Sequence, residues 1–258
     1  MKKTAICLGV LFWTLASFTA GVEYQRGDVD QDGNVSISDV VCLIDYLLKG
    51  TWEEAVTPPY EHEWVDLGLP SGTLWATCNV GASAPEDYGD YFAWGETEPK
   101  DYYDWDTYKW CNGSDDSMTK YCTDGIHGYN GFKDGKTELD PEDDAAYVNW
   151  GPSWRMPTSE QQKELCEKCS STWTTLNGVS GRLFTGPNGN TLFLPAAGYR
   201  WRKSLNAAGL LGFYWSRTLY PDRSHVAYLL HFDSGRVYWT NYIRSNGQTV
   251  RAVRVSQN

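Results

Sequence analysis

Basic residues are scarce in this chain, which has 22 Lys and Arg against 33 Asp and Glu and a formal net charge of −11. A protein that binds nucleic acid usually carries a basic stripe, because contacts to the phosphate backbone supply much of its affinity. The composition therefore predicts no nucleic-acid partner. A chain this acidic suits divalent cations or a basic partner surface better.

Long hydrophobic runs are absent beyond the first 21 residues. Within those residues, Lys2 and Lys3 precede an apolar stretch at 6–20, and small residues at 16–21 permit cleavage. This pattern is typical of a secretory signal peptide, and the stretch is short for a transmembrane helix. We expect residues 1–21 to be removed. The mature protein is then secreted or held at the cell surface, with no membrane span.

Common catalytic motifs are missing as well. The sequence contains neither Gly-x-Ser-x-Gly nor His-Glu-x-x-His, and its four histidines lie in unrelated contexts. A glycosidase needs two facing carboxylates, for which Glu96 with Asp143 or Asp144 is one candidate pairing. Acids are so frequent around these residues that such pairs are expected by chance. The sequence therefore favours a non-enzyme, and the enzymatic alternative is a hydrolase of glycosidic bonds.

Cysteine is present, but without the spacing of a zinc site. Six cysteines follow the signal peptide, namely Cys42, Cys78, Cys111, Cys122, Cys166 and Cys169. Export permits disulfides, although the sequence does not choose among the pairings. Cys111 and Cys122 flank a polar loop that a bridge would close. For Cys78, Cys166 and Cys169 we expect either a bridge from Cys78 to one of the other two, or buried thiols.

The most informative stretch is 28–39, with the sequence DVDQDGNVSISD. Counted as a twelve-residue loop, it has carboxylates at positions 1, 3, 5 and 12 and Gly33 at position 6. Ca²⁺ is a hard cation that takes several oxygen ligands, and this spacing folds oxygens around one point. Apolar residues at helical spacing over 40–48, followed by Gly50, predict a helix after the loop. The simpler alternative is an acidic turn that caps this helix.

Asp39 at position 12, in place of Glu, and the lack of a preceding helix distinguish this loop from a standard EF-hand. In both respects the loop resembles a type I dockerin repeat. The resemblance implies that the calcium ligands are Asp28, Asp30, Asp32, Asn34, Ser36 through a water molecule, and Asp39. It also implies that Ile37 and Ser38 contact a cohesin-like partner. A full dockerin has two repeats and this sequence has one, so a calcium-stiffened module is the main expectation.

Composition suggests how the chain is divided. After the signal peptide, residues 22–50 form the dockerin-like repeat, and residues 51–61 form a linker whose two consecutive prolines favour extended geometry. Residues 62–258 are then one large domain.

Charge is unevenly distributed within the large domain. Residues 97–150 carry 13 Asp and Glu against 5 Lys, whereas residues 151–258 carry 13 Lys and Arg against 5 acids. We predict that 97–150 is a long acidic insertion at the surface. Either it lies across the basic half of the domain, or the basic half faces an anionic ligand.

Short strands alternate with turns through the large domain. Residues 73–78 alternate as a half-buried strand should, and Thr158 with Gln161 forms a capping box that begins a mostly polar surface helix. Further strands are predicted at 172–174, 182–185, 191–194, 212–216, 227–232, 236–239 and 250–254. Turns at 186–190 and 233–235 are typical of hairpins. The predicted fold class is α+β, a β-rich domain with a surface helix and a long insertion, preceded by a small α-helical calcium-loop module.

Several motifs occur in order along the large domain. They are 72–82 (GTLWATCNVGA), 88–96 (YGDYFAWGE), 154–158 (WRMPT), 194–200 (LPAAGYR), 214–216 (YWS) and 250–254 (VRAVR). Over residues 62–256 the chain resembles the Fibrobacter succinogenes major paralogous domain. The resemblance implies a secreted bacterial domain with a C-type-lectin-like fold, in a family without a well-defined activity. Gly186-Pro187-Asn188 lacks the acid of the lectin triplet Glu-Pro-Asn, so no lectin calcium site is expected there.

Aromatic residues are abundant, with 13 Trp and 17 Tyr. Most are expected in the core of a β-rich domain, and the alternative for any one of them is a platform on which a sugar stacks. The sequence as a whole predicts a non-catalytic secreted binding or adhesion protein, in which the calcium module presents the lectin-like domain to a glycan or a cell-surface protein. The alternative is a component of polysaccharide degradation, either a glycoside hydrolase or a cellulosome-like accessory subunit.

Overall fold

The computed structural model describes residues 62–255. The predicted signal peptide, calcium loop and linker lie outside these residues and stay predictions. The same holds for the predicted calcium ligands and partner-binding residues, which are Asp28, Asp30, Asp32, Asn34, Ser36, Ile37, Ser38 and Asp39. Within the described part, no helix is long and apolar enough to cross a membrane.

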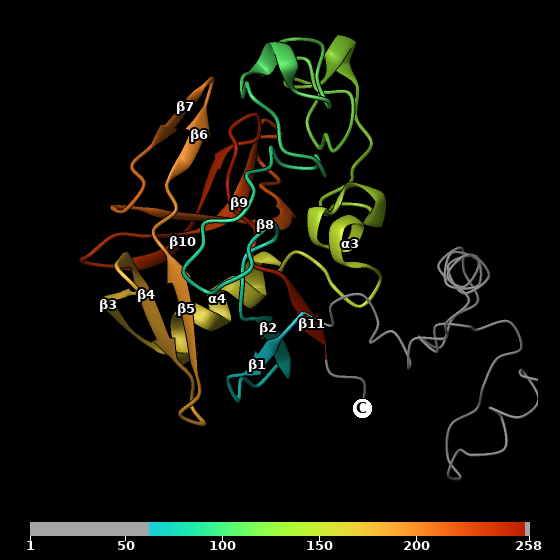
Figure 1. The fold of residues 1–258 in the computed structure, drawn as a ribbon. Helices are drawn as coiled ribbons and strands as arrows, with labels where there is room; N and C mark the ends of the chain where they lie inside the picture. The colour runs from blue at the N-terminus through green and yellow to red at the C-terminus, as the bar shows by residue number, and fades with distance from the viewer. Residues whose placement is uncertain (1–61, 256–258) are drawn as a thin grey trace, which may run out of the picture. The chain divides into compact units, whose positions relative to one another are not determined.

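The described residues form a β-rich domain of small antiparallel sheets, as predicted (Figure 1). The first sheet has the order β1 (Trp64–Asp66), β2 (Thr73–Ala76) and β11 (Val253–Val255). Trp75 in the central strand pairs with Val65 on one side and Val253 on the other. This sheet therefore joins the beginning and the end of the domain.

The central position of β2 corrects one prediction. A half-buried strand was expected at 73–78, but all four residues of β2 are buried. Trp75 lies in one buried apolar cluster and Ala76 in another, so both faces of the strand are covered. Alternation in the sequence shows that successive side chains point to opposite faces, and it does not show that one of those faces meets water.

The second sheet is a meander, and its second turn lies at the predicted residues 186–190. It consists of β3 (Ser170–Leu176), β4 (Val179–Thr185) and β5 (Thr191–Pro195). In the turn between β4 and β5, the amide of Gly186 donates to the carbonyl of Asn190. Asn188 in the same turn donates through its side chain to the carbonyl of Asp66, which ties the turn to β1.

A short hairpin, β6 (Tyr199–Trp201) and β7 (Ser204–Asn206), was not predicted. Its turn places Arg202 at a positive φ of 52°, a conformation that sequence reasoning reserves for Gly or Asn. The side chain of Trp201 is 47 % exposed, so this strand carries little of the apolar alternation that marks a buried one.

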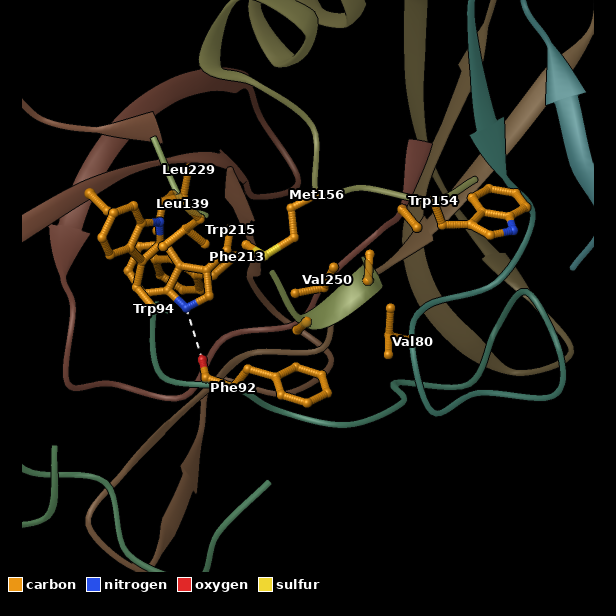
Figure 2. Close-up of a cluster of buried hydrophobic side chains, with 14 of the residues drawn as sticks. Val80, Phe92, Trp94, Leu139, Trp154, Met156, Phe213, Trp215, Leu229 and Val250 are labelled. Atoms are coloured by element: carbon orange, nitrogen blue, oxygen red, sulfur yellow. Dashed lines mark hydrogen bonds between the residues drawn. The ribbon is translucent and has the colours of Figure 1, made fainter. Parts of the chain in front are cut away.

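The third sheet divides the apolar core of the domain. It consists of β8 (Gly212–Leu219), β9 (Val226–Phe232) and β10 (Val237–Ile243). Trp215 and Leu229 belong to one buried cluster, and Tyr214 and Leu230 belong to the other. Figure 2 shows the first cluster, in which the indole of Trp215 donates to the carbonyl of Phe92 at 2.9 Å. The buried polar atom of this tryptophan is therefore satisfied.

The helix α4 (Ser159–Lys168) begins as predicted. Thr158 accepts from the Gln161 amide, and the Gln161 side chain accepts from the Thr158 amide, which completes the capping box. The predicted polar surface is only partly observed, because Gln162 is buried and donates to the carbonyl of Tyr214 at 2.8 Å. A polar residue can face the core when the adjacent strand offers an acceptor. The helix packs against β8, β9 and β10.

The acidic segment 97–150 contributes to the core, contrary to the predicted surface position. It contains η1 (Trp105–Thr107), η2 (Tyr129–Gly131), η3 (Pro141–Asp143) and α3 (Ala145–Trp150), joined by irregular chain. The side chains of Tyr103, Tyr108 and Tyr121 are buried, and their hydroxyls donate to Tyr91 O, Trp94 O and the Asp143 carboxylate. Because these tyrosines follow no helical or strand period, periodicity did not identify them as core residues.

The two halves of opposite charge do meet. Asp104 pairs with Arg202 at 2.8 Å and Glu138 with Arg217 at 2.6 Å. Arg244 is fully buried against the acidic segment. Its guanidinium donates to the hydroxyl of Tyr108 and to the carbonyls of Lys120, Tyr121 and Ser224. The first of the two predicted explanations, contact between the halves, is therefore observed at these residues.

Disulfides are not formed among the described cysteines. The bridge considered between Cys111 and Cys122 is absent, and so is one from Cys78 to Cys166 or Cys169. The thiols of Cys111 and Cys122 make separate hydrogen bonds. Cys111 donates to the carbonyl of Trp105, and Cys122 donates to the carbonyl of Asp124. Burial raises the pKa of Cys166 to about 12 and that of Cys169 to about 11, so both stay protonated thiols.

Candidate binding site

The carboxylates considered for glycoside hydrolysis are held by the protein itself. Glu96 accepts from the ammonium of Lys100 and from the amide of Lys109. Asp143 accepts from the hydroxyl of Tyr121 and from the ammonium of Lys120, both at 2.6 Å. These hydrogen bonds give each carboxylate a structural role. Among the described residues, the two carboxylates are not found facing each other across a cleft.

Asp144 is also structural. It caps α3 by accepting from the amides of Ala146 and Tyr147, and it accepts from the amide of Met156 at 2.9 Å. Burial raises the pKa of Asp144, and the backbone hydrogen bonds oppose that shift. The carboxylate thus joins α3 to the strand-like segment before α4.

Asp140, Glu142 and Asp143 place three carboxylates close enough together to surround a cation. The ammonium of Lys120 lies 2.7 Å from Asp140, 3.8 Å from Glu142 and 2.6 Å from Asp143. Burial lowers the pKa of Lys120, but its hydrogen bonds to Asp140 and Asp143 outweigh this and raise it overall. The lysine occupies the place that a metal would take, so this cluster is explained by an ion-pair network.

A pocket of about 380 Å³ lies beside the N-terminal part of α4, and we call it the Trp239 pocket. It is lined by Thr137, Ser159, Glu160, Lys163, Thr218, Leu219, Pro221, Tyr228 and Trp239. α4 packs against β8, β9 and β10, and residues of the helix and of all three strands line the pocket. Its walls come from α4, from the three strands β8, β9 and β10, and from the acidic segment.

Two aromatic residues, Tyr228 and Trp239, line the pocket, and Tyr220 lies outside it beside Tyr228. The ring of Tyr228 on β9 lies 5.3 Å from that of Trp239 on β10, and Tyr220 lies 5.2 Å from Tyr228 on the other side. Trp239 is 38 % exposed although it belongs to a strand whose neighbours are largely covered. Its directly opposite partner is Leu230, which is buried under α4. The exposed ring thus lies at the margin of the apolar core.

Charged and hydroxyl groups surround these rings. The ammonium of Lys163 lies 5.8 Å from the centre of the Trp239 ring. Glu160 accepts from the hydroxyl of Ser159, and the Ser159 amide donates to the hydroxyl of Thr218. Burial raises the pKa of Tyr228, so its hydroxyl stays neutral and can both donate and accept.

The arrangement suits a ligand with an apolar face and polar edges. An aromatic ring gives a flat contact surface, while the carboxylate, ammonium and hydroxyl groups above it fix orientation through hydrogen bonds. Sugars have this character. The aromatic and polar residues of the pocket together support the binding of such a ligand.

Sequence reasoning did not identify Trp239, Tyr228, Glu160 or Lys163 as a site. The strand at 236–239 and the helix beginning at Thr158 were predicted separately, and no local signal showed that they are adjacent. The one available sign was an unusually high tryptophan content. It did not distinguish an exposed ring from the buried majority.

Comparisons with known proteins do not add an identity. No family model matches the chain, and neither a curated protein nor a solved structure matches it significantly.

Proposed function

We propose that this is a secreted, non-catalytic glycan-binding protein, and that the Trp239 pocket holds the sugar. The observation that carries the proposal is the partly exposed indole of Trp239, with Tyr228 beside it and Glu160 and Lys163 at its rim. In this proposal a sugar ring stacks on Trp239, and its hydroxyls bond to the polar groups of α4.

The remainder of the chain completes the proposed protein. The dockerin-like loop binds Ca²⁺ through Asp28, Asp30, Asp32, Asn34 and Asp39, and presents a C-type-lectin-like domain of the major paralogous family. Support comes from the motifs in the sequence and from the β-rich architecture with several small antiparallel sheets. A cohesin-like protein is the partner that this module would take.

The experiment is a screen of the mature protein, with Ca²⁺ present, against an array of neutral and acidic oligosaccharides, followed by titration calorimetry with the best ligand. Trp239→Ala is expected to weaken binding about tenfold or more, because truncating an aromatic residue at the centre of a binding site can cost about 2 kcal/mol, and about 1.4 kcal/mol corresponds to tenfold. Trp201→Ala is the matched control, since Trp201 is also exposed but lies on the β6–β7 hairpin.

Equal affinity in the wild type and in Trp239→Ala would overturn the placement of the site. The absence of any saturable ligand in the array would count against glycan binding. The calcium module is tested separately, by titrating the wild type and an Asp28→Ala, Asp32→Ala double variant with Ca²⁺. One site that disappears in the variant is the expected result.

A further inference from the structure

Two of the four histidines of the chain meet where the acidic segment contacts the loop between β8 and β9. The imidazole of His127 lies 4.4 Å from that of His225, measured between ring centroids, with 35° between the ring planes. The side chain of His127 is 19 % exposed, so the pair lies near the surface. Neither histidine belongs to the Trp239 pocket.

Asp124 holds His127 in one orientation. One carboxylate oxygen accepts from Nδ1 of His127 at 2.7 Å and from its backbone amide at 2.9 Å. The other oxygen accepts from the hydroxyl of Ser224 at 2.6 Å and from its amide at 3.1 Å. Because a carboxylate only accepts, the proton of the His127 ring lies on Nδ1, and the lone pair is on Nε2.

His225 contributes a second nitrogen that the protein does not use. Its Nδ1 atom is buried and has no hydrogen-bond partner among the described residues. A buried polar atom without a partner is costly, and such exceptions call for an explanation such as an ion or a water molecule. The exposed carboxylate of Asp115 also interacts electrostatically with this ring.

These features match the requirements of a borderline-soft metal ion. Imidazole nitrogen suits Zn²⁺, Ni²⁺ and Cu²⁺, whereas Ca²⁺ and Mg²⁺ take oxygen ligands. A histidine that binds a metal commonly donates its other ring N–H to a carboxylate, which is what His127 does with Asp124. The acidic triad at Lys120 has none of these properties, because a lysine fills it.

We propose that His127 and His225 bind a divalent transition metal of the Zn²⁺ class, with Asp124 as the residue that positions His127. Water supplies the remaining ligands. This site differs in ligand chemistry from the predicted calcium loop, which offers oxygen atoms. Binding joins the acidic segment to the β8–β9 loop, two stretches about one hundred residues apart in the sequence that are already linked by Asp124 and Ser224.

The test is calorimetric titration of the mature protein with ZnCl₂ in a chelator-free buffer, with saturating Ca²⁺ to fill any oxygen site. One equivalent of Zn²⁺ is expected to bind. His127→Gln and His225→Gln are expected to weaken binding at least about tenfold, and Asp124→Asn about 10- to 100-fold, as for other positioning carboxylates. His62→Gln is the matched control, because His62 stacks on Trp150 away from the pair.

A second readout separates loss of the site from loss of the fold. Zn²⁺ is expected to raise the melting temperature of the wild type and of His62→Gln, and to leave that of His225→Gln unchanged, because a ligand stabilises only the state that binds it. Circular dichroism checks that the variants are folded. The proposal is overturned if the wild type shows no saturable binding, or if folded His127→Gln and His225→Gln bind Zn²⁺ as tightly as the wild type.

Discussion

The acidic segment 97–150 and the β8–β10 sheet bury side chains to a similar depth, but by different means. The sheet is held by ladders of backbone hydrogen bonds, with one irregularity in β8 between Trp215 and Leu219, and by apolar contacts on both faces. The segment has little regular structure. Its buried residues Tyr103 and Tyr108 donate to backbone carbonyls, and so does Arg244, which comes from the basic half and packs against the segment. Irregular chain can be buried when side chains satisfy the carbonyls that a ladder would otherwise use.

The difference predicts where single polar substitutions matter most. In the sheet, one side-chain hydrogen bond is a small addition to many backbone bonds. In the acidic segment, one side chain frequently serves several backbone groups at once, so its removal leaves several buried acceptors unpaired. The predictions below test this contrast.

The largest effect is expected for Arg244→Met. The change removes donors to the Tyr108 hydroxyl and to the carbonyls of Lys120, Tyr121 and Ser224, all around a fully buried guanidinium. We expect the free energy of unfolding to fall by about 3 kcal/mol or more. Urea denaturation measures it, with Arg236→Met as a control that changes stability by less than about 0.5 kcal/mol because Arg236 is exposed. A loss as small as that of the control would refute the contrast.

Tyr121→Phe is expected to have a smaller effect. The hydroxyl donates to Asp143 at 2.6 Å and accepts from the amide of Asp140 at 2.9 Å, so its removal leaves a partly buried amide without its partner. We expect a loss of about 1–3 kcal/mol in the same denaturation experiment. Hydrogen exchange should show the loss first at the amide of Asp140. Unchanged protection there would mean that the hydroxyl is dispensable.

Thr158→Ala tests the part of the domain that is built from regular helix and sheet. Thr158 accepts from the Gln161 amide in the capping box of α4, and this bond is one of a single pair at a partly buried helix end. The expected loss is about 1 kcal/mol. Thr158→Ser should recover most of it, since serine caps equally well. A larger loss than that of Tyr121→Phe would reverse the order that the contrast predicts.

The mildest perturbation is a decrease in pH from 7 towards 6. Burial lowers the pKa of His62, His225 and His231 from the ordinary value of 6.5. Between 6.5 and the lower folded values, the unfolded chain binds protons that the folded one does not, so stability falls as the pH decreases. The loss is complete below the folded pKa values. Thermal melts across pH 5–8 measure this loss of stability. The His225→Gln variant should show a weaker dependence of the melting temperature on pH than the wild type. A stability that rises on acidification over this range would contradict the lowered values.

Local chemistry explains the predictions that succeeded. The capping box of α4 and the turns after β4 and β9 depend on residues within a few positions of one another, so the sequence contains all the information they need. The predicted strands overlap β3, β4, β5, β8, β9, β10 and β11 for the same reason. The candidate site was not predictable in this way, because Glu160 and Trp239 are brought together only by the packing of α4 on the sheet.

By itself, the sequence determined the β-rich character of the large domain and the start of α4, whereas the acidic calcium loop at 28–39 stays a prediction. Only the tertiary structure decided which aromatic residues are buried, that the acidic segment is part of the core, and that Trp239 is exposed in a pocket. It also decided that His127 and His225 are neighbours. The physical reason is that periodicity and capping are local, whereas burial and side-chain proximity depend on contacts between residues far apart in the chain.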